Sequence, residues 1–185
     1  MANTTTLRAK GSWREQLVRD LTGDVLEIGV GSGANLPLYR AAAGVWAIEP
    51  DATLAAKAES RRGETSVPIV VKVGAAESLP FEDARFDHVV SSLVFCSVAD
   101  PERALGEIRR VLKPDGALHM VEHIRPTTSA VAAVFSAVTP IWSRVAHNCH
   151  LDRPTIDLLR GHGWTVHLHR RRTVFVHVTA IPPAP

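Results

Sequence analysis

The sequence predicts an α/β protein built on a mostly parallel sheet with helices on both faces. Short apolar runs that fit buried strands alternate with helical segments along most of the chain. A glycine-rich turn, residues 29–33, follows the first apolar run, and such a turn lets a ligand approach the backbone closely. Near the C-terminus, two strand-like segments can pair as a hairpin. In a sheet of this kind, the ligand site lies at the carboxyl ends of the strands.

In the first half of the chain, three segments have helical character. Apolar positions in residues 7–21 recur at helical spacing, and we expect an N-terminal helix within residues 1–20 across the mouth of the site. Residues 35–43 would form the first crossover helix, because Pro37 near its start needs no amide partner. Residues 51–62 are rich in alanine and begin at a good N-cap. The strands expected between these segments are residues 25–30, 45–48 and 69–73.

The second half continues the alternation and ends in the hairpin. A helix opens at Asp100, which is followed by a proline and an acid, and stops before Lys113. Residues 128–145 are rich in alanine and valine and are interrupted by Pro140, and residues 155–161 predict a short helix. The strands expected here are residues 88–94, 117–124, 165–170 and 173–181.

Length and composition fit one globular domain over residues 1–185. The chain is 45% hydrophobic and 22% charged with a formal net charge of +2, which argues against a nucleic-acid-binding protein. The basic run 170–172 fits a solvated hairpin end better than a phosphate-binding patch. Two cysteines, Cys96 and Cys149, are too few and too far apart for a disulfide framework. With no signal peptide or membrane span evident, we expect a cytoplasmic protein without stable membrane insertion.

The glycine turn favours a cationic ligand over a dinucleotide. Dinucleotide-binding turns have the spacing G-x-G-x-x-G, whereas Gly29, Gly31 and Gly33 give G-x-G-x-G. Glu27 precedes the first glycine by two residues and would repel a pyrophosphate but attract a positive charge. Glu49 closes the next apolar run about 20 residues later, where an acid can bind ribose. This pattern disfavours a dehydrogenase.

Five motifs in order resemble those of class I S-adenosylmethionine-dependent methyltransferases. They are residues 25–33, 49–51, 74–81, 86–92 and 109–117. The resemblance implies a Rossmann-like fold with a mostly parallel seven-stranded sheet and an antiparallel C-terminal strand. It also implies S-adenosyl-L-methionine as cofactor, S-adenosyl-L-homocysteine as product, and methyl transfer to a small-molecule acceptor.

A narrower resemblance is to the methyltransferase-like 7, or thiol methyltransferase, type. Residues 93–98, 121–124 and 142–153 carry it. Those relatives have a hydrophobic N-terminal anchor, but residues 1–19 here are polar and short, so the anchor is not carried over. A thiol acceptor is therefore one expectation. An amine, lipid or quinone-like acceptor, or a non-catalytic module that binds the cofactor, are the alternatives.

The same resemblance assigns roles at the donor site. Glu27 would receive the methionyl ammonium, Glu49 would bind the ribose hydroxyls, and Ala76 and Glu77 would flank adenine. Ala75 stands where many relatives carry an acid, so an adenine contact at that point must come from a neighbour or water. The full set of expected cofactor-binding residues is Glu27, Gly29, Gly31, Gly33, Asn35, Glu49, Pro50, Ala76, Glu77, Ser92 and Leu93.

On the acceptor side, His123 is the candidate general base, because it follows the fifth strand and can exchange a proton near neutral pH. The alternative is a structural histidine bonded to backbone, since methyl transfer can proceed by alignment alone. His147 and Cys149 would contact the substrate. Their spacing matches no zinc motif, and we expect no metal. The segment 126–153, with its apolar part 130–142, would cap the acceptor pocket, dock a lipid-like substrate or form the face of a homodimer.

Overall fold

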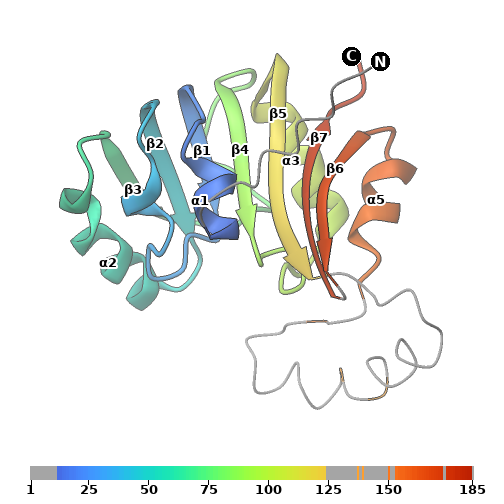
Figure 1. Cartoon of the computed structure of the whole chain (residues 1–185), viewed down its shortest axis with the longest axis horizontal. Helices are drawn as coiled ribbons and strands as arrows, with labels where there is room; N and C mark the ends of the chain where they lie inside the picture. Colours follow the sequence, from blue (N-terminus) through green and yellow to red (C-terminus); the bar gives the residue numbers. More distant parts are fainter. Residues whose placement is uncertain are drawn as a thin grey trace, which may run out of the picture.

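The structure is a computed structural model and describes residues 12–123, 137, 139, 150, 153–172 and 174–184. Its strands form one seven-stranded sheet in the order β3-β2-β1-β4-β5-β7-β6 (Figure 1). The strands are β1 (Gly23–Ile28), β2 (Ala42–Glu49), β3 (Ile69–Val73), β4 (Phe86–Ser92), β5 (Leu112–His123), β6 (Thr165–Arg172) and β7 (Phe175–Ile181). Strands β1 to β5 are parallel, and β7 runs antiparallel to both of its neighbours. The predicted fold class, including the antiparallel C-terminal strand, is confirmed.

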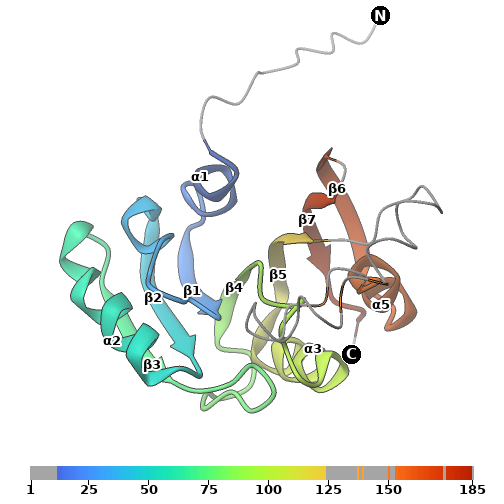
Figure 2. The ribbon, with the colours of Figure 1, turned by 90° about the horizontal axis from the view of Figure 1, so that it is seen from below.

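Helices cover both faces of this sheet. They are α1 (Trp13–Val18), α2 (Ala52–Ser60), α3 (Pro101–Val111) and α5 (Thr155–Gly161), with 3₁₀ turns η1 (Leu36–Leu38) and η2 (Arg62–Glu64). Figure 2 shows α1 and α3 on opposite sides of the sheet. Within the described part of the chain, no helix has the length and apolar character needed to cross a bilayer.

Strand alternation divides the core into two hydrophobic clusters, one for each face. In β1, Val25 packs in the cluster of α1 and α2, whereas Leu26 and Ile28 point to the α3 and α5 side. All three side chains are completely buried. Strands covered on both faces need apolar residues at nearly every position, and the runs seen in the sequence meet that need.

The start positions of two helices follow from side-chain caps. Asp51 accepts hydrogen bonds from the amides of Thr53 and Leu54, and Asp100 accepts one from the amide of Arg103. Each carboxylate satisfies donors that the first helical turn leaves unpaired. The predicted helix starts at both aspartates are confirmed.

The crossover helix expected over residues 35–43 is wrong. The chain makes only the short turn η1 there, and Ala42 already belongs to β2. Tyr39 is the reason, because its side chain is 1% exposed and its hydroxyl donates to Glu27 at 2.8 Å. A continuing helix would carry Tyr39 away from this buried carboxylate and leave no residues to reach β2.

The described N-terminal helix, α1, packs on the sheet through its buried residues. Leu17 and Val18 are buried in the cluster that includes Val90 and Val121 of the central strands. Residues 1–11 lie outside the described residues, as does the segment 128–145 apart from residues 137 and 139. The crossing of the site mouth by an N-terminal helix, and the cap over residues 126–153, stay predictions.

A row of histidines crosses the α1 side of β4, β5, β7 and β6. His88 Nδ1 and His119 Nε2 lie 3.1 Å apart, and His119 Nδ1 lies 3.3 Å from the hydroxyl of Thr179. That hydroxyl also contacts His169 Nε2 at 2.8 Å, and the rings of His169 and His177 are 5.0 Å apart. Burial lowers the pKa of His119 to about 3 and that of His177 to about 4, and the neighbouring histidines add to both shifts. His119 and His177 are therefore uncharged at neutral pH.

The free energy of unfolding should fall as the pH drops below about 6.5, because unfolded histidines take up protons that the folded His119 and His177 refuse. Replacing His119 by glutamine should reduce this loss, since glutamine keeps a polar group and does not titrate. Urea unfolding of both proteins between pH 5 and pH 8 measures the difference. His162→Gln, at the exposed end of α5, is the control. An unchanged acid slope in His119→Gln would contradict the assignment.

Candidate functional site

The candidate site lies along the carboxyl ends of β1, β2, β4 and β5, the edge onto which Figure 2 looks. The chain leaves β1 toward β2 on one side, while β4 pairs with β1 on the other side. Loops that diverge in this way leave a crevice at the strand ends, which is where open α/β sheets bind ligands. The turn 29–35, Glu49, Leu93 and His123 follow or end these four strands.

The glycines of the turn serve two different needs. Gly31 has φ +57°, and a β-carbon added there would meet no atom within 4 Å. Its left-handed backbone thus borders open space, as close approach of a ligand requires. Gly29 has φ +59°, but its β-carbon would come within 2.6 Å of the Val94 side chain. Packing inside the protein therefore explains Gly29, and a similar close approach of Ala58 and Leu36 explains Gly33.

Glu27 is a buried carboxylate held by neutral donors. Its side chain is 2% exposed and accepts hydrogen bonds of 2.8 Å from Asn35 Nδ2 and from the hydroxyl of Tyr39. Arg14 reaches only the amide oxygen of Asn35, at 3.3 Å. Burial raises the pKa of Glu27 to about 7, although these hydrogen bonds and Arg14 oppose the shift. Among the described residues, Glu27 thus has no directly contacting cation.

Tyr39 and Arg14 are site residues that sequence reasoning missed. Tyr39 is the single tyrosine of the chain, and its place four residues after Asn35 was the available signal. A helix over residues 35–43 would turn Tyr39 away from Glu27, so the predicted helix gave no reason to select Tyr39 as a site residue.

Glu49 ties the end of β2 to the glycine turn. Its Oε2 accepts the amide of Gly31 at 2.9 Å, and its Oε1 accepts the amide of Asp51 at 3.1 Å. The side chain is 7% exposed. Each oxygen retains the capacity to accept a second hydrogen bond, which is what binding a pair of hydroxyl groups requires. Pro50, between the two acids, is exposed.

The loop after β3 is anchored to α3, and this anchoring occupies the side chains expected around adenine. Glu77 Oε1 accepts the amide of Ala99 at 2.9 Å and that of Asp100 at 3.3 Å, while its carbonyl accepts Arg103 Nε at 2.8 Å. Ala76 packs into the core at 7% exposure. Oε1 and the carbonyl of Glu77 therefore already have partners within the protein.

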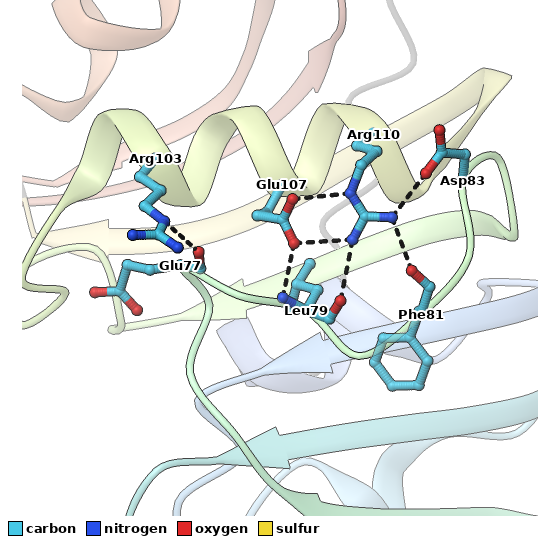
Figure 3. A network of polar contacts seen from close by, with 7 residues as sticks. All are labelled: Glu77, Leu79, Phe81, Asp83, Arg103, Glu107 and Arg110. Carbon is cyan, nitrogen blue, oxygen red and sulfur yellow. Dashed lines mark hydrogen bonds and ion pairs between the residues drawn. The ribbon is translucent and has the colours of Figure 1, made fainter.

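A second set of bonds fixes the following residues on the same helix (Figure 3). Glu107 accepts the amide of Leu79 at 2.7 Å and both sides of the Arg110 guanidinium at 2.8 Å. Arg110 also donates to the carbonyls of Leu79 and Phe81 and to Asp83, at 3.0, 2.7 and 2.8 Å. Paired guanidinium–carboxylate contacts of this kind define a loop geometry strongly.

The end of β4 contains a strained turn. Leu93 has φ +62°, a left-handed conformation that costs a residue with a β-carbon on the order of 1 kcal/mol. Its amide donates to the carbonyl of Val121 at 2.8 Å, and this bond holds it against β5. The hydroxyl of Ser92 is buried and has no hydrogen-bond partner within the described structure. The expectation that Ser92 and Leu93 line the methionyl side of the ligand stays a prediction.

Glu122 is a further acid at this edge that sequence reasoning did not select. It is 1% exposed, and its Oε1 accepts the Ser91 hydroxyl at 2.6 Å and the amides of Val94 and Phe95 at 2.9 and 3.2 Å. Burial raises its pKa to about 6. The signal available in the sequence was an acid inside the apolar run of β5, because a glutamate is rarely fully buried unless its carboxylate has bonding partners.

His123 ends β5 beside Phe175, with ring centroids 4.3 Å apart. Burial lowers the pKa of His123, so the imidazole is neutral at pH 7. Its Nδ1 is buried and makes no hydrogen bond in the described structure. His147 and Cys149 lie outside the described residues. Cys96 is 3% exposed and packs after β4.

Comparison with known proteins gives matches to methyltransferases. A family model described as a methyltransferase domain matches residues 26–120. The thiol S-methyltransferase TMT1B of Rattus norvegicus is 33% identical over 149 residues, which cover 75% of this chain and 60% of that protein. A phosphatidylethanolamine N-methyltransferase of Cereibacter sphaeroides is 34% identical over 118 residues, covering 63% and 58%. The chain thus spans about 60% of the length of these relatives.

Solved structures agree with these matches. A putative methyltransferase from Bacillus halodurans has a TM-score of 0.72 at 21% identity, over 85% of this chain and 69% of that chain. An S-adenosylmethionine-dependent methyltransferase from Thermotoga maritima, described as a possible histamine N-methyltransferase, has a TM-score of 0.66 at 25% identity, over 92% and 88%.

The buried charge of Glu27 should reduce stability at high pH. Its pKa is raised from 4.5 to about 7, so the contribution of Glu27 is fully present below pH 4.5 and is lost as the pH rises through 7. Relative to the native chain, Glu27→Gln should therefore gain on the order of 1–3 kcal/mol between pH 4.5 and pH 8. Urea unfolding at both pH values measures this gain, with the exposed Glu82→Gln as control. A constant difference across this range would refute the raised pKa.

Proposed function

The chain belongs to the methyltransferase domain family, and from this premise we propose that it transfers a methyl group from S-adenosyl-L-methionine to a small-molecule acceptor, a thiol. The observation that carries the proposal is the junction at Gly31. There the Gly31 amide donates a hydrogen bond to Glu49, and the space next to Gly31 is open. Glu49 is thus held beside this open space, at the position where an acid can bind ribose. Glu27 lies on the adjacent strand β1 and is bonded to Asn35, at the end of the same turn.

The residues present fit this donor. Glu49 would bind the ribose hydroxyls through its two remaining acceptor sites, while backbone groups of Ala76 and Glu77 would read the adenine edge. Glu27 would receive the methionyl ammonium, directly or through water, and the positive charge would lower the pKa of Glu27 toward its ordinary value. A buried acid that destabilises the empty protein is thereby stabilised by the ligand. Bound S-adenosylmethionine supplies a methyl group already activated by its sulfonium.

The contribution of the protein is then alignment and exclusion of water. An acceptor that attacks the methyl carbon in direct displacement needs no covalent enzyme intermediate, so rate depends on the distance and angle of approach. The strained turn at Leu93 and the buried hydroxyl of Ser92 lie beside β1, on the methionyl side of the crevice. S-adenosyl-L-homocysteine would be the product.

A thiol acceptor is supported by the relative from rat, whose name states thiol S-methylation. The second candidate is an amine, because the bacterial relative of similar identity is named for N-methylation of a phospholipid amine. A quinone-like acceptor and a non-catalytic module that binds the cofactor remain the alternatives. Cytoplasmic localisation and a homodimer stay predictions.

Purified protein should form S-adenosylhomocysteine with small aliphatic thiols and not with matched amines or phenols. Glu49→Ala is the blank, because it removes the ribose contact. Glu27→Gln should bind S-adenosylhomocysteine at least tenfold more weakly while unfolding at higher urea concentration above pH 7. Turnover on amines alone would replace the thiol assignment. Binding of the product without turnover on any acceptor would favour the non-catalytic module.

For the general base we propose His123, whose neutral imidazole ends β5 at the same edge. A thiol has a pKa near 8.5 and is mostly protonated at pH 7, so a neighbouring base would assist by taking the thiol proton as the sulfur attacks. Burial lowers the pKa of His123, which makes it a weaker base but leaves its imidazole unprotonated and free to accept that proton.

Replacing His123 by asparagine should lower kcat with a thiol by roughly 10- to 100-fold at pH 7. The deficit should shrink at pH 9, where the free thiol ionises without help. Affinity for S-adenosylhomocysteine should stay unchanged, as isothermal titration calorimetry would show. A deficit that is equal at both pH values would mean that His123 is a structural residue.

A further inference from the structure

We propose that Glu122 is a positioning residue: it holds the turn after β4 so that Val94 seats the glycine turn after β1 in its donor-binding form. The proposal rests on the donor site proposed above. On this proposal Glu122, an acid of strand β5 on the acceptor side, influences the affinity of the protein for the methyl donor.

The first part of the argument is the convergence of donors on Glu122. One carboxylate oxygen, Oε1, accepts hydrogen bonds from the hydroxyl of Ser91 and from the amides of Val94 and Phe95, at 2.6, 2.9 and 3.2 Å. Successive amides of a turn point to the same side only in a narrow range of backbone conformations. The carboxylate therefore selects that conformation, and the left-handed Leu93 just before it is part of the same arrangement.

The second part is the contact between Val94 and Gly29. A β-carbon built on Gly29 would lie 2.6 and 2.7 Å from the two methyl carbons of Val94, so this side chain occupies the space directly against the glycine. Any shift of the Val94 backbone would move those methyl groups. The first glycine of the donor turn is thus packed on a residue whose amide is fixed by Glu122.

The third part is the opposite side of the turn, where carbonyls are held by the C-terminal part of the chain. Arg153 Nη1 donates to the carbonyls of Phe95 and Val98 at 2.7 and 2.6 Å, and the amide of His150 donates to the carbonyl of Cys96 at 2.7 Å. Since these bonds hold the far side, loss of Glu122 would release the amide side alone. The turn would then pivot where Val94 meets Gly29.

The surroundings of the second oxygen of Glu122 indicate that the hydrogen bonds to Oε1, rather than the negative charge, position the turn after β4. Oε2 is buried and has no hydrogen-bond partner in the described residues, and burial raises the pKa of the group. A glutamine would keep one carbonyl oxygen for the same donors and would remove the buried charge. Glu122→Gln should therefore preserve positioning, whereas Glu122→Ala should abolish it.

The test is a double-mutant cycle on S-adenosylhomocysteine binding, measured by isothermal titration calorimetry on variants whose folding is checked by circular dichroism. Glu122→Ala and Val94→Ala should each weaken binding by roughly tenfold, and the double variant should bind no more than about threefold more weakly than either one. Glu122→Gln should stay within about threefold of the native chain. Val98→Ala, the same deletion in the same loop but away from Gly29, is the matched control and should stay within about twofold.

Each outcome decides a different point. If the native chain fails to bind S-adenosylhomocysteine, the proposed function falls. If it binds and the losses in the double variant multiply, or Glu122→Gln is as weak as Glu122→Ala, positioning through Val94 is wrong while the function stands. Should Glu122→Ala not fold, Ser91→Ala replaces it in the cycle, because it removes one bond to Oε1 and leaves the acid in place. If Ser91→Ala and Val94→Ala weaken binding independently, so that their losses of binding free energy add in the double variant, coupling through Val94 is again refuted.

Discussion

The site depends on one constraint, which is that backbone amides exposed at the carboxyl edge of a parallel sheet need acceptors. The chain meets this need with carboxylates at or beside the ends of strands. Glu49 accepts the amides of Gly31 and Asp51, and Glu122 accepts those of Val94 and Phe95. The bonds to Gly31, Val94 and Phe95 each join one strand end to the loop that follows another strand, whereas the bond to Asp51 stays within the loop after β2. Buried side chains therefore fix the loops after β1 and β4 relative to the neighbouring strands.

The use of carboxylates as acceptors places acidic side chains near the position where the proposed ligand carries a positive charge. Glu27 and Glu122 are buried acids whose pKa values rise to about 7 and about 6 because water is excluded from them. Buried charges without cationic partners reduce stability. In the proposed complex, the positive charge of the ligand would offset that cost for Glu27, so ligand affinity and the loss of stability would arise from one residue. The loop after β3 shows the contrasting solution, because Arg110 pairs with Glu107 and the geometry of that loop is fixed without a ligand.

The sequence motifs located the site but did not assign every role within it. Gly29, Gly31 and Gly33 share one spacing in the sequence, yet only Gly31 borders open space. Glu77 matches an adenine-flanking position, although its carboxylate anchors the loop before α3. Glu122 lies in a segment that resembles the thiol methyltransferase type, but a single sequence does not reveal its role, because its donors are two amides and a serine hydroxyl on and after another strand. Contacts of this kind depend on which strand lies beside which.

The sequence by itself determined the order and type of most elements, because apolar periodicity, capping aspartates and glycine spacing are local properties. It predicted β1 to β7 and the helix starts at Asp51 and Asp100, and it identified the glycine turn and the two acids, Glu27 and Glu49, that bond to residues of the turn. The tertiary structure alone decided that residues 35–43 form a short turn, since the partner of Tyr39 is a carboxylate buried in β1. It also decided the packing of Val94 on Gly29 and the neutrality of His119 and His177. Burial and close contact join residues that are distant along the chain, and such effects appear only when the sheet has assembled.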